Sequence, residues 1–399
     1  MIYDFDELPD RRYTESIKWN QYEEDVLPMW VADMDFRSPE PVVQALEARI
    51  RHGVFGYPVE IPQLREVIVE RLQQIYDWEV QPEEIIFMPG VIKGFNLACQ
   101  AVADPGSAVL VQPPIYPPML EAPGHAGVER RESALVQAGD GRYVVDWASF
   151  EDAIDERTRL FILCNPHNPT GRVFRREELE HMAEICLRKG VVICSDEIHC
   201  DLVYPGERHI PIAMLDPEVA QNTITLMAPS KTFNLPGLQC SYAIIHNPDL
   251  RERYEEIRVP FMNWVNILGQ VAALAAYRDG GEWHAQLMAY LEGNRDYVHR
   301  YVTEKLPGIS MVTPEGTYLA WLDCRESGIQ SDAGIQSDAG IRMDAGEFFL
   351  KHARVALNNG ADFGKGGEGF VRLNFGTPRA VLAEGLSRMK ATLQELRAA

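Results

Sequence analysis

The stretch that decides the fold reads Thr223-Ile-Thr-Leu-Met-Ala-Pro-Ser-Lys-Thr-Phe-Asn-Leu-Pro-Gly-Leu-Gln-Cys-Ser-Tyr-Ala-Ile-Ile245. A β-branched apolar run, 223–227, predicts a buried strand that ends at a proline, and a second strand-like run covers 241–245. Between them, Lys231 follows Ser230 where the chain leaves the core. A desolvated lysine has a lowered pKa and can form a Schiff base, whereas a solvated loop lysine is the ordinary alternative. The pair alone favours the ordinary alternative, so the rest of the chain decides.

The composition indicates a large, acidic protein. The chain has 399 residues, 46% of them apolar, which is enough for a sizeable core, and its length suggests two or three domains. Lysine and arginine total 38 against 59 aspartates and glutamates, so the formal net charge is −21. This balance argues against nucleic acids or anionic membranes as partners, and a well-hydrated surface is enough to explain it.

The sequence carries no signal for secretion or membrane insertion. Its first residues lack the basic and apolar regions of a signal peptide, and the longest weakly polar run, 265–277, is too short and interrupted to span a bilayer. The seven cysteines form no Cys-x-x-Cys pair, so the sequence predicts neither a metal site nor a disulfide framework. We expect small core cysteines in a cytoplasmic protein.

Short apolar runs alternate with helical segments between residues 82 and 245. This alternation predicts an α/β fold in which helices cover both faces of a mostly parallel sheet. Ligands bind beyond the carboxyl ends of the strands in such sheets. The expected strands are 85–88, 108–111, 160–164, 191–194 and 223–227, and the clearest amphipathic helix is 177–189.

The flanking segments have a different character. Residues 1–40 are irregular and aromatic, and 27–36 have the composition of an extended arm that packs against another part of the chain. The C-terminal part, with its short strands and final helix, predicts an α+β unit. The expected helices are 39–51, 62–76, 248–260, 263–303 with an interruption near 279–281, and 378–396. The expected strands are 309–312, 318–322 and 369–375.

A tandem hexad lies between Gly328 and Ala345, where Gly-Ile-Gln-Ser-Asp-Ala occurs twice and Gly-Ile-Arg-Met-Asp-Ala once. A repeat this short cannot form a solenoid, and we interpret it as a duplication in a surface loop, where added length costs little. Asp344 and Glu347 are spaced as a capping box that would begin a helix over 345–353.

Polar residues follow the ends of the expected strands. Because the carboxyl ends of parallel strands meet at one edge of a sheet, seven such residues after five strands predict a ligand site better than they predict solvated loops. The residues are Gly90, Tyr116, Asn165 with Asn168, Asp196, and Ser230 with Lys231.

A Schiff-base lysine at this edge suggests pyridoxal phosphate, which needs an anion opposite its pyridinium nitrogen, a phosphate site and a ring to stack on. Asp196 can be that anion, although a helix N-cap is an equally common role for an aspartate. The N–H groups of Gly90, Val91 and Ile92 at a helix N-terminus, with the Ser230 hydroxyl, can bind phosphate. A single glycine is common in loops, however.

Three further side chains could contact the cofactor, and each has an ordinary alternative. Tyr116 could stack on the cofactor ring or pack within its loop. Asn168 could donate to the phenolate oxygen or form the turn of Asn-Pro-Thr-Gly. His199 could approach the same oxygen or be a structural histidine.

Arg372 lies within the otherwise apolar segment Val-Arg-Leu-Asn-Phe. Burial of an unpaired guanidinium is costly, so this side chain requires a carboxylate. A substrate α-carboxylate bound in a bidentate manner would fit an enzyme that acts on amino acids. An internal aspartate or glutamate is the competing partner.

Taken together, these residues resemble the fold-type I pyridoxal-phosphate enzymes of the class I/II aminotransferase superfamily, and within it the MalY/PatB-type C–S lyases, which are cystathionine β-lyase-like. The resemblance runs from about residue 2 to the C-terminus. The segments that carry it are 18–19, 27–36, 54–57, 165–172, 195–199, 230–234 and 372–376.

The resemblance implies a large domain, 46–284, which binds pyridoxal phosphate on a mostly parallel sheet of the seven-stranded type. It implies a smaller α+β domain that combines 1–45 with 285–399. It also implies a homodimer in which Tyr57 reaches the partner's active site. The implied contacts within one chain are Lys231 as the Schiff-base lysine, Asp196 on the ring nitrogen, Asn168 on the phenolate, Tyr116 in stacking and Arg372 on the substrate carboxylate.

Two residues distinguish the chain from ordinary aminotransferases of this superfamily. His199 stands where those enzymes usually carry a tyrosine, and Gln239 lies near the position of a phosphate-binding arginine. These features resemble the lyase branch, which implies α,β-elimination from a cysteine S-conjugate such as cystathionine. An aminotransferase is the alternative. A regulatory protein on the same fold is a third reading, and the sequence leaves no room for a DNA-binding helix-turn-helix.

Overall fold

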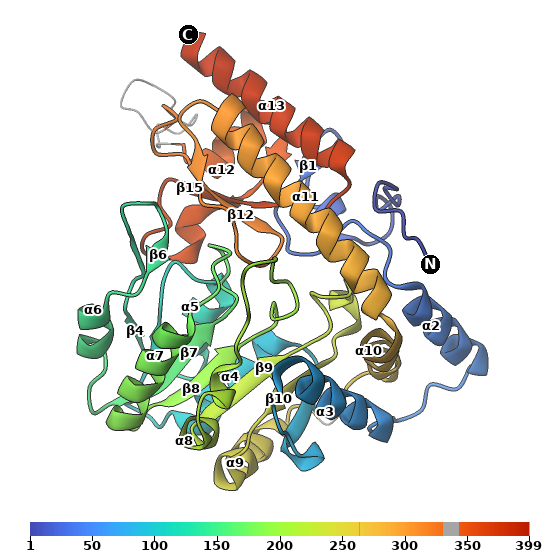
Figure 1. Ribbon diagram of the computed structural model, residues 1–399, viewed down its shortest axis with the longest axis vertical. Helices are drawn as coiled ribbons and strands as arrows, with labels where there is room; N and C mark the ends of the chain where they lie inside the picture. Colours follow the sequence, from blue (N-terminus) through green and yellow to red (C-terminus); the bar gives the residue numbers. More distant parts are fainter. Residues whose placement is uncertain (263, 330–342, 399) are drawn as a thin grey trace.

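The central layer of the computed structural model, which describes residues 1–262, 264–329 and 343–398, is a seven-stranded sheet (Figure 1). Its strand order is β2-β10-β9-β8-β7-β3-β4. All of its strands run in one direction except β10, which is antiparallel to both of its neighbours. The strands are β2 (Ile85–Met88), β3 (Ala108–Val111), β4 (Glu129–Glu132), β7 (Thr158–Cys164), β8 (Val192–Asp196), β9 (Thr223–Met227) and β10 (Ser241–Ile244).

Helices cover both faces of this sheet, which is why its central strands are buried along almost their whole length. On one face, α4 (Val91–Val102), α5 (Pro117–His125) and α9 (Pro248–Arg258) contribute to a single core with the strands. On the other face, α6 (Trp147–Asp152) and α7 (Arg176–Lys189) pack against the alternate strand residues. The predicted α/β architecture with a mostly parallel sheet is therefore confirmed.

A second, four-stranded antiparallel sheet has the order β11-β12-β15-β14. The long helices α11 (Gly281–Lys305) and α13 (Arg379–Ala398) lie side by side on it (Figure 1). Its strands are β11 (Ser310–Met311), β12 (Leu319–Asp323), β14 (Asn358–Asn359) and β15 (Phe370–Asn374).

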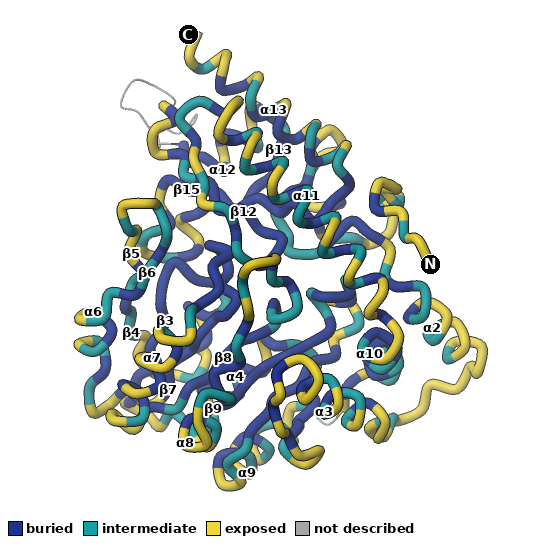
Figure 2. Tube along the Cα trace, in the orientation of Figure 1, coloured by how far each residue is buried: buried dark blue, intermediate teal, exposed yellow. Residues whose placement is uncertain are grey.

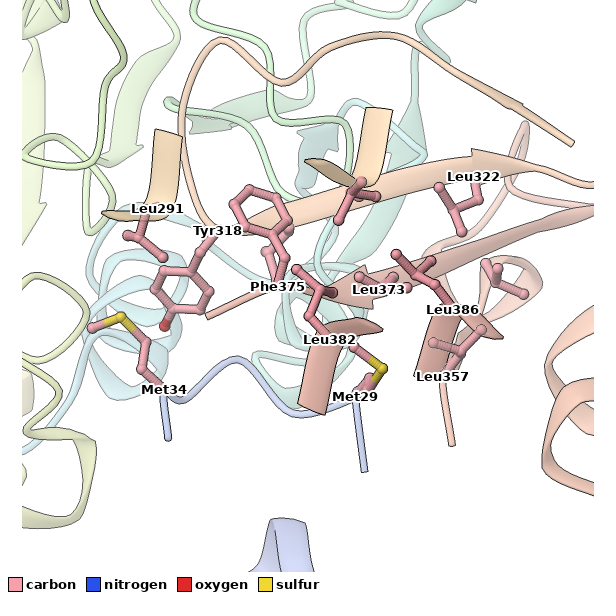
Figure 3. Close-up of a cluster of buried hydrophobic side chains, with 14 of the residues drawn as sticks. Met29, Met34, Leu291, Tyr318, Leu322, Leu357, Leu373, Phe375, Leu382 and Leu386 are labelled. Atoms are coloured by element: carbon pink, nitrogen blue, oxygen red, sulfur yellow. The ribbon is translucent and has the colours of Figure 1, made fainter. Parts of the chain in front are cut away.

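The N-terminal segment joins this second layer. Its short strand β1 (Leu27–Pro28) pairs in parallel with β13 (Val355–Ala356), more than 300 residues later in the chain. Met29 and Met34 of the segment lie among the buried side chains of the second core (Figure 3). The expectation of an arm that packs elsewhere in the chain is thus correct.

The remaining helices lie close to their predicted positions. The interruption expected near 279–281 is confirmed, because Gly280 separates the two helices α10 and α11. Asp344 caps its helix by accepting from the Glu347 N–H at 2.8 Å. The other elements are α2 (Glu40–His52), α3 (Pro62–Tyr76), α10 (Ile267–Asp279) and α12 (Ala345–Phe348).

Several elements were not predicted, and β4 and α5 are the most informative of them. The edge strand β4 consists entirely of charged residues, and charged side chains on an edge strand discourage pairing with another sheet. Helix α5 begins with two prolines, which the first turn of a helix tolerates because its N–H groups have no intrahelical acceptor. Most of the hexad repeat, 330–342, lies outside the described residues.

The apolar face predicted for α2 is only partly buried. Val42 is buried, whereas Val43 and Ile50 are exposed. The following segment, 53–60, is also exposed (Figure 2). The cysteines are free and almost all buried, as expected. Among the described residues, no helix is long and apolar enough to cross a membrane.

Candidate active site

A cavity of about 970 Å³ lies at the carboxyl edge of the seven-stranded sheet. The parallel arrangement of β2, β3, β7, β8 and β9 delivers the polar residues that follow them to one place. Asn165 is not part of the lining; its side-chain oxygen accepts from the Phe174 N–H at 3.1 Å. The predicted residues that line the cavity are Gly90, Val91, Ile92, Tyr116, Asn168, Asp196, His199, Ser230, Lys231 and Arg372.

Lys231 lies in the turn after β9, and its amine points into the cavity. The Nζ atom donates to the carbonyl oxygen of Ala32 at 2.5 Å. Burial lowers the pKa of Lys231 to about 8, although the negative charges of Asp33 and Asp196 oppose this effect. A substantial neutral fraction is therefore available near neutral pH, which is the form a nucleophilic amine needs.

Asp196 ends β8 and is almost fully buried. One of its carboxylate oxygens accepts from the Ile198 N–H at 3.0 Å. Burial raises the pKa of Asp196 to about 7, and the neighbouring Glu197 acts in the same direction. A cationic ring nitrogen opposite this carboxylate would supply the positive charge that keeps it ionised.

His199 lies in the turn that follows β8. Its ring is buried, and Nδ1 has no hydrogen-bond partner among the described residues. Burial lowers the pKa of His199 well below its usual value, with further contributions from Lys231 and Arg372, so the ring is neutral. A buried ring nitrogen without a partner fits a bound group that supplies one.

The N-terminus of α4 is the candidate phosphate site. Gly90 precedes it with φ 111°, which favours glycine. The Gly90 N–H already donates to the Met88 carbonyl at 3.0 Å and to Ser241 Oγ at 2.9 Å. The expectation that this N–H binds phosphate therefore does not fit. Gly90 instead shapes the turn, and Val91 and Ile92 offer the N–H groups that a helix start leaves free.

Arg372 projects from β15 into the same cavity and is buried. Its guanidinium donates to Asn168 Oδ1 at 2.7 Å, to Asn358 Oδ1 at 2.6 Å and to the Trp30 carbonyl at 2.9 Å. These partners are neutral, and burial lowers the pKa of Arg372 to about 10. No internal carboxylate pairs with it in the described part of the chain, so the site is suited to an incoming anion.

Asn168 and Tyr116 complete the part of the site near Arg372. Because the Asn168 side-chain oxygen accepts from Arg372, its amide N–H groups can donate to another acceptor. Tyr116 caps the start of α5 and lines the cavity, where burial raises the pKa of its hydroxyl. Ser230 and Gln239 also line the cavity, the latter with a left-handed backbone at φ 48°.

Tyr57, like Asn165, is a predicted residue that lies outside the cavity. Its side chain is 89% exposed, and its ring lies 5.2 Å from that of Trp264. Within a single chain the structure does not bring it to Lys231.

The sequence did not predict that the N-terminal segment lines the cavity. Trp30, Ala32 and Asp33 line the cavity opposite the sheet edge. Asn234 holds this segment in place, accepting from the Met34 N–H at 3.0 Å and donating to the Met34 carbonyl at 2.8 Å. The available signal was the unusual run 27–36, which indicated an arm but not its target.

The residues present fit pyridoxal phosphate. They provide a lysine amine, a buried carboxylate, a buried histidine nitrogen without a partner, amide donors and a helix start preceded by a glycine. A sheet edge with this set of groups defines a fold-type I pyridoxal-phosphate enzyme.

The chain belongs to the aminotransferase class I and II family, whose model matches residues 21–389. It is 40% identical to the cystathionine beta-lyase PatB of Bacillus subtilis (strain 168), covering 98% of this chain and 99% of that protein. The crystal structure of OvoB is similar with a TM-score of 0.91 and 43% identity, over 98% and 99% of the two chains. The PLP-bound C–S lyase of Staphylococcus hominis is similar with a TM-score of 0.90 and 33% identity, over 98% and 99%.

Proposed function

We propose that this protein is a pyridoxal-phosphate-dependent C–S β-lyase that cleaves cystathionine or related cysteine S-conjugates by α,β-elimination. With cystathionine and water, the products are homocysteine, pyruvate and ammonia. The observation that carries the proposal is Arg372, which lines the same cavity as Lys231 and Asp196. Its guanidinium is buried, and its hydrogen-bond partners among the described residues are all neutral. The 40% identity to a cystathionine beta-lyase supports the choice of reaction.

Each residue contributes a defined step. Arg372 and Asn168 hold the substrate α-carboxylate, and this places the Cα–H bond near the amine of Lys231. The neutral Lys231 amine removes the Cα proton, after which the thiolate leaves from Cβ. When bound, the cofactor supplies an electron sink for the charge that develops at Cα, and Asp196 maintains the positive charge of its ring nitrogen.

The cofactor is held by groups at the sheet edge. Asn168 and His199 line the cavity and would donate to the phenolate oxygen, and Tyr116 would stack on the ring. Val91, Ile92 and Ser230 are the candidates for the phosphate, while Gly90 sets the turn that precedes them.

The proposed assembly is a homodimer of a cytoplasmic enzyme. Exposed apolar side chains are concentrated on α2 and the segment after it, where a second copy would cover them. This contact would place Tyr57 at the partner's active site, where it would bind cofactor and substrate. The exposed side chains are Val43, Ile50, Val54, Phe55, Tyr57 and Val59. Phe261 and Trp264, in the segment between α9 and α10, are exposed as well. We also propose a large domain, 46–284, and a smaller domain formed by 1–45 and 285–399. The residues labelled in Figure 3 belong to the proposed smaller domain, and their core also includes residues of the larger one, such as Phe233 and Trp283.

The test compares elimination with transamination. Purified, cofactor-loaded enzyme is incubated with cystathionine alone, and thiol and pyruvate are measured; a parallel reaction contains an amino acid and a 2-oxoacid. Equal formation of thiol and pyruvate without an oxoacid supports the lyase. Amino-group transfer without thiol release would instead establish an aminotransferase, and wild-type pyruvate formation by Lys231→Ala would overturn the role of the lysine.

A further inference from the structure

The segment 30–34 forms the roof of the cavity over Lys231, although it has no regular secondary structure. The carbonyl oxygen of Ala32 accepts from Lys231 Nζ at 2.5 Å and from the Tyr318 hydroxyl at 2.9 Å. The flanking strand β1 has only two residues. Backbone bonds hold the ends of the segment, such as the one from the Asp35 N–H to the Gly376 carbonyl at 2.9 Å, and side chains contribute the remaining contacts that set where the Ala32 carbonyl lies.

Four charged side chains converge behind this roof. Asp35 is fully buried and accepts from Lys18 Nζ at 2.7 Å, Arg11 Nη1 at 2.7 Å and Trp19 Nε1 at 2.8 Å. Asp33 binds the same arginine, with its Oδ2 at 2.7 Å from Arg11 Nη2. Lys18 is also buried and lies 3.7 Å from Asp33 Oδ1. The two cations balance the two anions, and all come from the first 35 residues.

This arrangement of buried charges is not explained by its net contribution to the free energy of unfolding. Buried ion pairs roughly offset their own desolvation, and apolar side chains of similar size would often hold a segment equally well. What a buried charge network provides is a single arrangement, because a shift of the segment would leave buried charges without partners. The segment also packs tightly against Gly376, just after β15: a Cβ at Gly376 would lie 2.8 Å from Met34 Cγ, so only glycine fits there without a shift of Met34.

We propose that Arg11, Lys18, Asp33 and Asp35 form an electrostatic latch that fixes segment 30–34 over Lys231. The latch sets the position of the Ala32 carbonyl, and it holds the negative charge of Asp33 close to the lysine amine. These four are positioning residues that act through the roof. The inference rests on the proposed role of Lys231 in the site, but not on which reaction the enzyme catalyses.

The charge of Asp33 has a consequence for Lys231. The charged groups that face Lys231 are Asp33 from the roof, Asp196 from β8 and Arg372 from β15, and the neutral His199 ring lies after β8. The two carboxylates favour a positive charge on the lysine nitrogen, and Arg372 disfavours it. Replacing Asp33 by asparagine should therefore lower the pH at which this nitrogen loses its proton.

The first experiment measures release of the roof by limited trypsin digestion of the cofactor-loaded enzyme, following cleavage after Arg12 by mass spectrometry. Asp35→Asn and Arg11→Gln should be cleaved at least about ten-fold faster than wild type, because cleavage follows the population of opened chain. The control is Glu7→Gln, which breaks the exposed Glu7–Arg37 contact of 3.2 Å on the same segment and should be cleaved at the wild-type rate. Arg11→Gln covers the case in which Asp35→Asn does not fold.

The second experiment titrates the visible absorbance of the cofactor-loaded Asp33→Asn enzyme against pH. Its midpoint should fall by about one pH unit relative to wild type, since a nearby opposite charge favours the protonated nitrogen by about that much. A merely structural role for Asp33 would not move it. Wild-type cleavage of both latch variants, or an unshifted midpoint in Asp33→Asn, would overturn the latch. Both readouts are independent of the products formed, so failure of the lyase proposal would be seen separately.

Discussion

Arg372 donates to the side-chain oxygen of Asn168 across 2.7 Å, and this contact joins the second sheet to the loop after β7 of the first. The two residues are 204 positions apart in the chain. Their contact places an anion-binding guanidinium and a free amide on the same side of the cavity, next to the lysine amine.

Replacing Arg372 by methionine should weaken substrate use while leaving the fold intact. The loss of a charge-assisted contact in a buried site costs about 3 kcal/mol, so kcat/KM for cystathionine should fall by about 150-fold. Steady-state kinetics measure this effect. The matched control is Arg325→Gln, an arginine that pairs with Asp323 away from this cavity, and it should retain wild-type kcat/KM. Equal losses in the two variants would contradict the role of Arg372.

Cofactor attachment should depend on pH through Lys231. Because burial lowers the pKa of this amine to about 8, the rate at which cofactor-free protein regains visible absorbance should rise with pH and level off above 8. A lysine in water would give a midpoint near 10.4 instead, at about its ordinary pKa. Stopped-flow absorbance over pH 6–10 measures the midpoint, and Lys231→Ala should show no such band.

Removal of the cofactor should expose a pH dependence of stability due to Asp196. The pKa of this carboxyl is raised to about 7 in the folded chain, so between its unfolded pKa and 7 the folded state binds the additional proton. The free energy of unfolding should therefore fall as pH rises through this window, by up to about 4 kcal/mol from this group. Urea denaturation of cofactor-free wild type and Asp196→Asn at pH 4.5 and 7.5 tests this. The asparagine variant should lose that part of the pH dependence, and an identical slope would contradict it.

Tyr57 provides a test of subunit sharing. If it completes the partner's site, Tyr57→Ala and Lys231→Ala should each be inactive or nearly so as pure proteins. Their refolded 1:1 mixture should recover about one quarter of wild-type activity, because half of the dimers are mixed and each has one intact site. No recovery in a mixture shown by light scattering to contain dimers would contradict an intersubunit role.

The sequence by itself determined the class of fold and most of the cavity lining. Apolar runs such as 223–227 and 108–111 became strands with the predicted bounds, because strands buried on both faces must be apolar throughout. The order of strands and helices required a parallel sheet, and that geometry brought Asp196, Asn168 and Lys231 to one edge.

Only the tertiary structure decided which donors and acceptors of the site already have hydrogen-bond partners within the chain. It also decided which segment covers the cavity. The Gly90 N–H is used by Met88 and Ser241, which lie on neighbouring strands far apart in sequence. The charged strand β4 exists because β3 provides a partner for its backbone, although its own side chains give no apolar signal.

The same holds for the roof over Lys231. The sequence showed an unusual aromatic and acidic run, but the contact of Ala32 with Lys231 joins residues that are 199 positions apart in the chain. Local patterns report burial and periodicity, whereas hydrogen bonds and ion pairs between distant residues depend on how whole layers pack. For this protein the lysine, its carboxylate and its sheet edge could be predicted from the sequence, and the roof that positions the amine could not.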